Sequence, residues 1–461
     1  MVSLNSRATP FFLFFFSSTA VTLFLSPSSC HAAASNKIDN DDDIYCHLGV
    51  RPPSHKRVFK LMGIELPISR CAWKIHGRVL PMLHFFEGGG SNSNCSKNKD
   101  GRRPPDVFVN LRVLWCKLLT SLDPDSPAYE GRPRGDCNDN NNNEKNMFAT
   151  YQMLPPCSIK WPLRYLGLWR LFPRWMHANI ELRTVYLQGA LDKVLAVKRH
   201  NEPESVAATE EPSSQDQHKS SLSDGDNSIA ESICFIILGG GYDPRGAMLS
   251  TSNGIRRVYE LDLPVVIDSK RRLLHRAGFR VINDDVDFPM DSDQEGDNCG
   301  VRLEGIDLND DASVDQVLDK IQQELILFSD KNSATTSTVT TLKRRRKRWS
   351  IVVISEAVLM YLRPEKAERV LEGLADRFRG VGGPNESHFT GASFVFADRL
   401  IRSDVTTTGS TIIRASSTVA NDAEGRGDLG VREWLRKTGW ELQELLFKPG
   451  ATRHLGIATT V

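Results

Sequence analysis

Apolar and polar residues follow different patterns in two parts of the chain, and the pattern changes near residue 179. From 179 to 198, apolar residues recur at helical spacing, which predicts one long helix. Beyond a polar stretch, short continuous apolar runs alternate with longer amphipathic segments, as strands alternate with helices. The expected strands are 233–238, 257–261, 301–305, 350–355, 392–397, 440–447 and 453–459. The expected helices are 264–277, 313–328, 364–379 and 430–438.

Continuously apolar strands that alternate with helices are typical of a mostly parallel sheet covered on both faces. The sequence therefore predicts an α/β fold with a doubly wound, mostly parallel, seven-stranded sheet. The last two strands have no helix between them, so we expect an antiparallel hairpin at the sheet edge.

The sequence of the N-terminal third of the chain does not predict a regular fold. Residues 1–34 combine a basic start, a short apolar core and an Ala-Ala-Ala end, which is typical of a cleaved signal peptide, with an uncleaved anchor as the alternative. Residues 35–160 form a Cys-containing, partly disordered extension with short apolar islands at 58–66 and 107–121. The remainder, 161–461, is expected to be one catalytic domain, which starts with a Trp- and Leu-rich packed helix or lid. Its expected disordered insertions are 201–230, 284–298 and 330–348.

Composition and charge give no sign of a nucleic-acid site or a zinc site. The formal net charge of +1 offers no general electrostatic case for nucleic acid. The basic run at 343–348 is interpreted as a solvated loop. No Cys-x-x-Cys pair occurs among the nine cysteines, so no zinc site is indicated, and their pairing stays open between disulfides and free thiols.

The strongest chemical signal is a glycine turn directly after the strand at 233–238. Gly239, Gly240 and Gly241 are followed by Asp243, and glycines here allow positive φ and close approach of a ligand. Glu260 and Asp262 end the next strand, where an acid typically accepts hydrogen bonds from a ribose. That spacing also fits NAD, although the turn lacks the G-x-G-x-x-G pattern.

Three weaker signals lie at other predicted strand ends or on the long helix. Asp307 and Leu308 are placed to contact an adenine, or alternatively Asp307 caps the next helix. Glu356 follows the fourth strand, and Tyr361 comes shortly after it, either facing a substrate or serving only in packing. Arg183, followed by Thr184, either grips a carboxylate with its guanidinium fork or is an ordinary helix residue.

These motifs, in this order, resemble the leucine carboxyl methyltransferase family over about residues 179–400. The matching pieces are "LRTVYL", "ILGGGYDPR", "VYELDLP", "GIDL" and "SEAVLMYLRPE". The resemblance implies a Rossmann-like class I methyltransferase fold and S-adenosylmethionine as methyl donor, with no metal. The candidate donor-binding residues are Arg183, Thr184, Gly239, Gly240, Gly241, Asp243, Glu260, Asp262, Asp307, Leu308 and Glu356, with Tyr361 orienting the acceptor. Gly240 and Pro244 depart from the usual family turn, and Pro244 removes a backbone donor.

The resemblance implies methyl transfer to an oxygen, with a protein C-terminal carboxylate of the leucine type as the acceptor. The alternatives are a small-molecule acid or alcohol as acceptor, and a catalytically silent scaffold with a methyltransferase fold. We expect no nucleic-acid partner, and no membrane attachment once the leader is removed. The leader favours the secretory pathway or the exterior, with the cytoplasm as the alternative.

Overall fold

A computed structural model describes the chain in separate ranges, within which the following statements apply. These ranges are 48, 58–61, 64–67, 105–130, 149–153, 160–172, 174, 177–200, 231–251, 255–282, 300–331, 348–380, 387–400, 428–448 and 453–461. The leader at 1–34 and the expected insertions at 201–230 and 284–298 lie outside them, as does nearly all of 330–348.

One sheet of eight strands organises the molecule, with the strand order β5-β6-β4-β3-β7-β8-β10-β9. Its strands are β3 (Glu231–Leu238), β4 (Ile255–Asp262), β5 (Val281–Ile282), β6 (Val301–Gly305), β7 (Arg348–Glu356), β8 (Phe389–Asp398), β9 (Trp440–Lys448) and β10 (Arg453–Thr460). All pairings are parallel except those of β10, which runs antiparallel to both β8 and β9. The expected fold and edge hairpin are confirmed. The eighth strand, β5, was not predicted because two residues are too short for a periodic signal.

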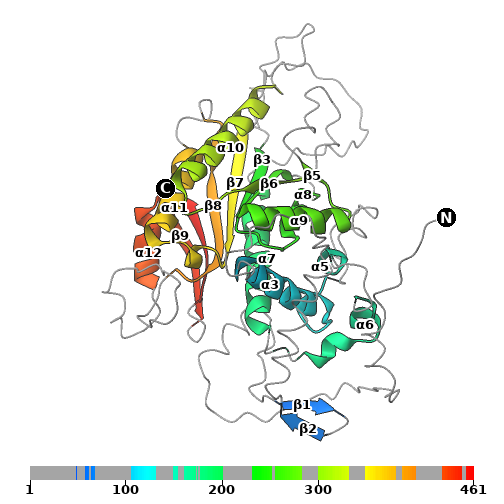
Figure 1. Cartoon of the computed structure of the whole chain (residues 1–461). Coiled ribbons are helices and arrows are strands. Elements are labelled where there is room, and N and C mark those ends of the chain that lie inside the picture. Colours follow the sequence, from blue (N-terminus) through cyan, green and yellow to red (C-terminus); the bar gives the residue numbers. More distant parts are fainter. Residues whose placement is uncertain are drawn as a thin grey trace, which may run out of the picture.

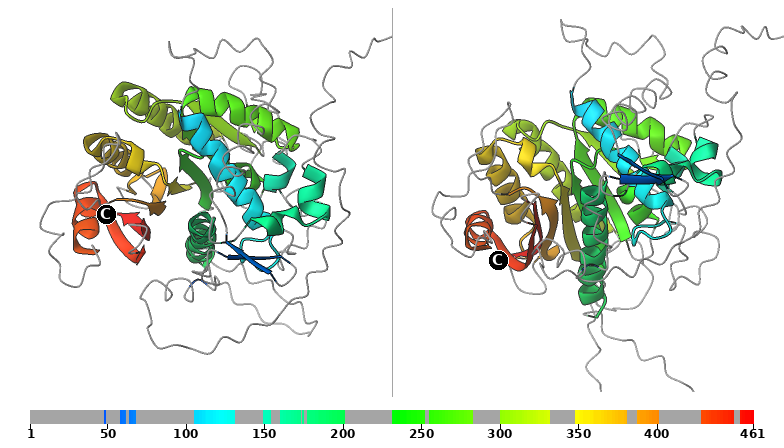
Figure 2. Two further views of the ribbon diagram at one scale, coloured as in Figure 1. Left: turned by 60° about the horizontal axis from the view of Figure 1, so that its bottom comes forward. Right: turned by 90° about the horizontal axis from the view of Figure 1, so that it is seen from below.

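Helices cover both faces of the sheet (Figures 1 and 2). The helices of the domain are α7 (Ala178–His200), α8 (Arg245–Ser250), α9 (Pro264–Arg276), α10 (Asp311–Lys331), α11 (Pro364–Phe378) and α12 (Asp428–Lys437). Alternate strand residues face opposite layers: Phe235 packs with α7 and α9, whereas Ile236 packs with α10, α11 and α12. The continuous apolar runs therefore reflect burial on both faces.

Part of the N-terminal extension packs against this domain. The extension contains β1 (Val58–Leu61), β2 (Ile64–Pro67), α3 (Pro105–Leu122) and α5 (Ala149–Met153). The Trp- and Leu-rich segment that follows it contains α6 (Lys160–Tyr165) and the 3-10 helix η2 (Leu168–Leu171). Strands β1 and β2 form a separate antiparallel hairpin. Leu111 and Leu114 of α3 share the main core with Leu182 of α7, and the two helices lie side by side (Figure 1). The apolar island at 107–121 is thus a packed helix of the same unit.

The order of the strands fixes where a ligand crevice lies. Strand β3 is central, and the chain continues to β4 on one side and to β7 on the other. In open sheets of this type, ligands bind outside the carboxyl ends of the strands at such a switch point. Among the described residues, no helix is both long and apolar enough to cross a bilayer.

Candidate active site

The glycine turn after β3 is shaped by its own packing. Gly239 and Gly241 have φ values of 55° and 49°, which residues other than glycine rarely adopt. A Cβ atom on Gly239 would lie 2.2 Å from a methyl group of Val358, and one on Gly241 would lie 2.8 Å from Oδ1 of Asn110. Two segments far apart in sequence therefore close over the turn, and glycine is required at both positions.

Glu260 lies beneath this turn and does not face the crevice. Only 1% of it is exposed, and its carboxylate pairs with the equally buried Lys270 of α9. A Cβ atom on Gly240 would meet the same carboxylate at 2.6 Å. Burial raises the pKa of the Glu260 carboxyl despite the neighbouring Lys270 ammonium. Glu260 supports the turn from inside.

Asp262 lies one step further along the same face of β4, beyond the cover of the helices. Its Oδ2 accepts a hydrogen bond from the Gly241 N–H at 2.8 Å, and its Oδ1 accepts one from the Leu263 N–H at 2.7 Å. The residue is half-buried, and each carboxylate oxygen can accept more than one hydrogen bond. Asp262 can therefore brace the turn and still accept hydrogen bonds from a ligand.

A buried cluster of charges joins α3 to the ends of β3 and β7. The ammonium of Lys117, on α3, lies 2.5 Å from Oδ2 of Asp243 and 2.7 Å from Oε2 of Glu356. Only 6% of the Lys117 side chain is exposed. Lys117 was not among the predicted site residues, because its segment gave no recognisable fold.

Two arginines complete this cluster. Arg245, the first residue of α8, lies 3.3 Å from Oδ2 of Asp243 and 3.4 Å from Oε2 of Glu356. Arg183 of α7 approaches Glu356 from the other side, with 3.4 Å between Nε and Oε1. The long helix thus brings Arg183 to Glu356 at the end of β7.

Positive charge exceeds negative charge in this cluster, in which Lys117, Arg183 and Arg245 face Asp243 and Glu356. Burial acts to raise the pKa of the Glu356 carboxyl, but the three cations outweigh it and hold that pKa below its usual value. In the same way, Arg245 and Lys117 hold the pKa of Asp243 well below its usual range, against the effect of burial. Both carboxylates are therefore ionised at neutral pH.

Two polar atoms of the cluster have unused hydrogen-bonding capacity. Within the described part of the chain, Nε of Arg183 and Oε1 of Glu356 are buried and have no hydrogen-bond partner. Their ion pair at 3.4 Å is too long to satisfy either atom. Buried polar atoms without partners are rare in proteins, and at a strand switch point they indicate a place for a ligand.

The other predicted residues differ in how they face the crevice. Asp307 is exposed, and its Oδ1 accepts a hydrogen bond from the Asn309 N–H at 2.9 Å, while Leu308 is buried in the core beneath it. Thr184 donates its hydroxyl to Ile180 O within α7, so this group stabilises its own helix. Tyr361 is 54% exposed, in the 3-10 helix η4 (Leu359–Tyr361) that follows β7.

Metal-ligand clusters are absent from the described ranges, in which no three His, Cys, Asp or Glu residues are arranged to hold an ion. Cys116 and Cys234 are buried free thiols, and burial raises the pKa of Cys116 to about 11. The remaining cysteines lie outside the described residues.

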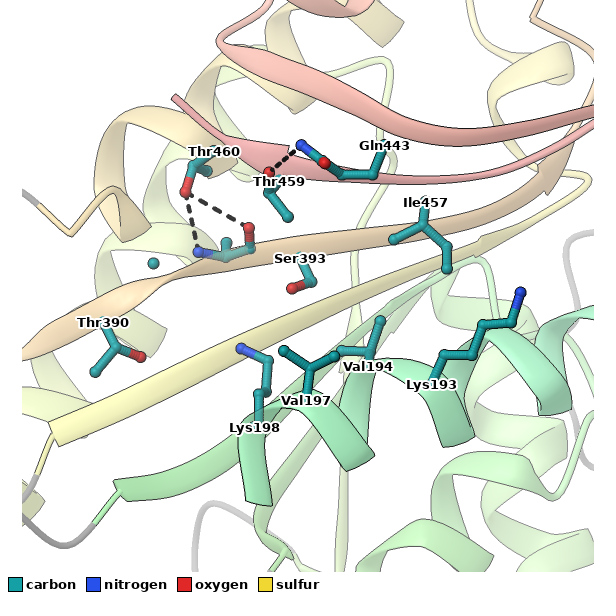
Figure 3. A pocket seen from close by; sticks show the side chains of 12 residues that line it. Lys193, Val194, Val197, Lys198, Thr390, Ser393, Gln443, Ile457, Thr459 and Thr460 are labelled. Carbon is teal, nitrogen blue, oxygen red and sulfur yellow. Dashed lines mark hydrogen bonds between the residues drawn. The ribbon is translucent and has the colours of Figure 1, made fainter. Parts of the chain in front are cut away.

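A second hollow lies at the opposite, amino edge of the sheet and contains none of the predicted residues (Figure 3). Its volume is about 550 Å³, and it lies between the C-terminal half of α7 and strands β8, β9 and β10. Lys193 and Lys198 line it together with hydroxyl groups such as that of Ser393. The charge of Lys193 is balanced by Glu444, 2.8 Å away, and that pair is open to solvent.

The strand order and the glycine turn at the switch point are those of a doubly wound, Rossmann-like α/β domain, which is the fold expected from the sequence. Residues 226–324, less than half of the chain, match the model of the leucine carboxyl methyltransferase family, which confirms the resemblance drawn from the sequence. No curated protein matches the chain.

The solved structures that match the chain have low sequence identity. They include SibL, an S-adenosylmethionine-dependent methyltransferase in its apo form, with 16% identity, 52% of each chain covered and a TM-score of 0.25. LaPhzM has 14% identity, 50% of each chain covered and a TM-score of 0.25. PigF with SAH has 11% identity, 50% of each chain covered and a TM-score of 0.25. The chain thus spans about half the length of these proteins.

Proposed function

We propose that this protein transfers a methyl group from S-adenosylmethionine to an oxygen, and that the acceptor is a carboxylate of the protein C-terminal leucine type. The observation that carries the proposal is the buried cluster of Lys117, Asp243 and Glu356 with two arginines at the switch point. The match to the leucine carboxyl methyltransferase family over 226–324 supports the choice of donor and acceptor.

The charges of the cluster complement the amino-acid end of the donor. That end carries a carboxylate and an ammonium, which require cationic and anionic partners. Arg183 and Lys117 supply positive charge, and the free Oε1 of Glu356 supplies an acceptor. The excess of positive charge matches the carboxylate, and an arginine fork suits its two oxygens.

The nucleoside end of the donor is assigned to the neighbouring strand ends. Asp262 would accept hydrogen bonds from the ribose with the capacity left on its oxygens. The exposed Asp307 carboxylate would accept from the adenine amine, and Leu308 would lie below the ring. In this proposal the three glycines, Glu260 and Thr184 shape the site, while Asp243 holds Lys117 and Arg245.

When bound, S-adenosylmethionine supplies a methyl group on a sulfonium: a C–O bond to the acceptor forms, the C–S bond breaks, and its electron pair stays on sulfur. A carboxylate acceptor is already ionised, so no side chain has to remove a proton. The protein's contribution is to hold donor and acceptor in line and to exclude water. Tyr361 is assigned to orient the acceptor, since it is exposed in the 3-10 helix that begins three residues after Glu356.

Two alternatives differ in their acceptor or in turnover. A small-molecule acid or alcohol would use the same donor site, and an alcohol would need a base to take its proton. A silent scaffold would need no donor at all, which disagrees with a buried cluster that retains unused hydrogen-bonding atoms.

The secretory destination of the chain is part of the proposal and rests on residues 1–34. An intact Met1 on protein purified from its source would contradict it.

Calorimetric titration with S-adenosylmethionine and with S-adenosylhomocysteine tests the donor site. We expect both to bind the wild type, and Arg183→Lys to bind more weakly because the bidentate fork is lost. Arg245→Lys is the matched comparison. If only that variant binds more weakly, the α7 helix serves for packing. A chain that binds neither donor form is a scaffold.

A second experiment, radiolabelled methyl transfer to C-terminal peptides and to small acids, then identifies the acceptor.

A further inference from the structure

The segment that follows β7 is held by one buried carboxylate on the neighbouring strand. Asp398, the last residue of β8, has no exposed surface. Its Oδ2 accepts hydrogen bonds from the Ser355 hydroxyl at 3.0 Å, the Val358 N–H at 2.8 Å and the Leu359 N–H at 2.9 Å. Its Oδ1 accepts from the Met360 N–H at 3.2 Å and from the N–H of its own neighbour, Arg399, at 2.8 Å.

This segment and the residue before it contain groups that the proposed reaction uses. Glu356 is the last residue of β7, directly before the segment, and Tyr361 ends the 3-10 turn whose first two amides bond to Asp398. Val358, between them, packs so closely on the glycine turn that no side chain fits at Gly239. The position of Asp398 therefore fixes the segment against both the charge cluster and the turn.

The backbone of the segment is strained where it leaves the sheet. Ala357 has a φ of 56°, a left-handed conformation that is strained for a residue with a Cβ atom. Such a conformation persists only when surrounding interactions impose it. The amides just beyond Ala357 all point at the Asp398 carboxylate, which supplies that constraint.

We propose that Asp398 is a positioning residue for the methyl-donor site: it imposes the turn at 355–360 that aims the Glu356 carboxylate at Lys117 and Arg183. This inference rests on the proposed function, because it assigns Glu356 to the donor. Within the described ranges, the hydrogen bonds of the Asp398 carboxylate go to this segment and to Arg399, and none goes to Lys117 or the glycine turn. Asp398 therefore acts through the backbone of the segment.

The test compares two variants of β8 in the full-length protein. Asp398→Asn replaces an acceptor oxygen with an amino group that faces the N–H groups, so the turn must rearrange. We expect the dissociation constant for S-adenosylmethionine to rise about tenfold, as for the loss of hydrogen bonds to a charged group. Val395→Ala, on the same strand, opens a cavity in the core but changes no hydrogen bond of the turn. It should lower the unfolding temperature and leave donor affinity unchanged.

Amide hydrogen exchange adds a readout that general destabilisation would not produce. In Asp398→Asn, exchange should accelerate about tenfold at Val358, Leu359 and Met360, while the central amides of β7 stay protected. Unchanged donor affinity in Asp398→Asn, or an equal loss of affinity in Val395→Ala, would overturn the assignment.

A milder variant covers the case in which Asp398→Asn does not fold. Ser355→Ala removes one donor to the carboxylate, and we expect about a threefold loss of donor affinity and faster exchange of the same amides. Unchanged affinity and exchange in that variant would contradict the proposal. If the wild type binds no donor, the proposed function fails. Faster exchange at 358–360 in the variants than in the wild type, measured without any ligand, would still show that the carboxylate holds the turn.

Discussion

Two lysines at opposite edges of the sheet make ion pairs of similar length in very different surroundings. Lys117, at the carboxyl edge, lies 2.5 Å from Asp243 and is 6% exposed. Lys193, in the hollow at the amino edge, lies 2.8 Å from Glu444 and is 60% exposed. Water solvates the second pair and weakens its attraction, whereas the buried charges of the first pair depend on one another. The two pairs differ in burial far more than in length, and the buried pair lies at the edge where we propose the reaction.

The largest effect is expected from Lys117→Met. The change leaves Asp243 and Glu356 buried with less positive charge, and breaking a buried pair costs about 3–5 kcal/mol. The remaining arginines should keep the loss near the lower end of that range. Urea unfolding measures the stability, and titration with S-adenosylmethionine measures the donor affinity. Lys117→Arg keeps the charge and is the control. A stable Lys117→Met protein with full affinity would remove Lys117 from the site.

A smaller effect is expected from Asp262→Ala, which removes the proposed ribose acceptor. The loss of a hydrogen bond to a charged group corresponds to about 1.5–3 kcal/mol of donor binding. Asp307→Ala is the matched comparison, because that carboxylate is exposed to solvent and its loss should cost less. Equal donor affinity of the folded Asp262→Ala protein and the wild type would exclude a ribose contact there.

The carboxyl edge also contains a buried neutral histidine, His454, which makes stability depend on pH. Burial, together with Arg399, lowers its pKa to about 3, and its Nδ1 accepts a hydrogen bond from the Leu400 N–H. Because the unfolded chain binds this proton more readily, stability is full above pH 6.5 and falls as the pH drops toward 3. The slope is about 1.4 kcal/mol per pH unit.

Thermal unfolding between pH 8 and 5 tests this expectation. The wild type should lose stability below pH 6.5 more steeply than His454→Asn, which cannot take up the proton. Parallel curves for the two proteins would show that His454 takes up its proton as readily in the folded protein as in the unfolded chain.

The smallest effect is expected from Lys193→Ala at the amino edge. Exposed ion pairs contribute about 0–1 kcal/mol, so stability and donor affinity should both stay near the wild-type values. Differential scanning calorimetry and donor titration check this. A loss of donor affinity comparable with that of Lys117→Met would contradict the difference drawn between the two edges.

The sequence predicted the sheet well because its strands are buried on both faces and its helices are amphipathic over several turns. Asp262 and Glu356 are the last residues of β4 and β7, and they lie at one edge of the sheet because parallel strands end together. Glu260 shows the limit of that rule. It lies two residues before Asp262 on the same face of β4, where the covering helices still enclose it with Lys270.

Lys117 and Asp398 could not be assigned in the same way. The two carboxylates that pair with Lys117 lie 126 and 239 residues further along the chain, so no local sequence pattern indicates them. A lone lysine within the apolar island at 107–121 was nevertheless a usable signal, because a buried ammonium needs an anionic partner. Asp398 follows an apolar strand just as Glu356 does, but its role depends on the neighbouring turn.

The distance along the chain between Lys117 and Glu356 has a consequence for how the protein is made. A ribosome must synthesise 239 further residues after Lys117 before its second carboxylate partner exists. Contacts of such long sequence separation form slowly, because the closure of a long loop precedes any gain from the contact. We therefore expect α3 to dock late in folding. Until then, the apolar face of this helix stays exposed to chaperones, and chains interrupted before residue 356 cannot complete the charge cluster.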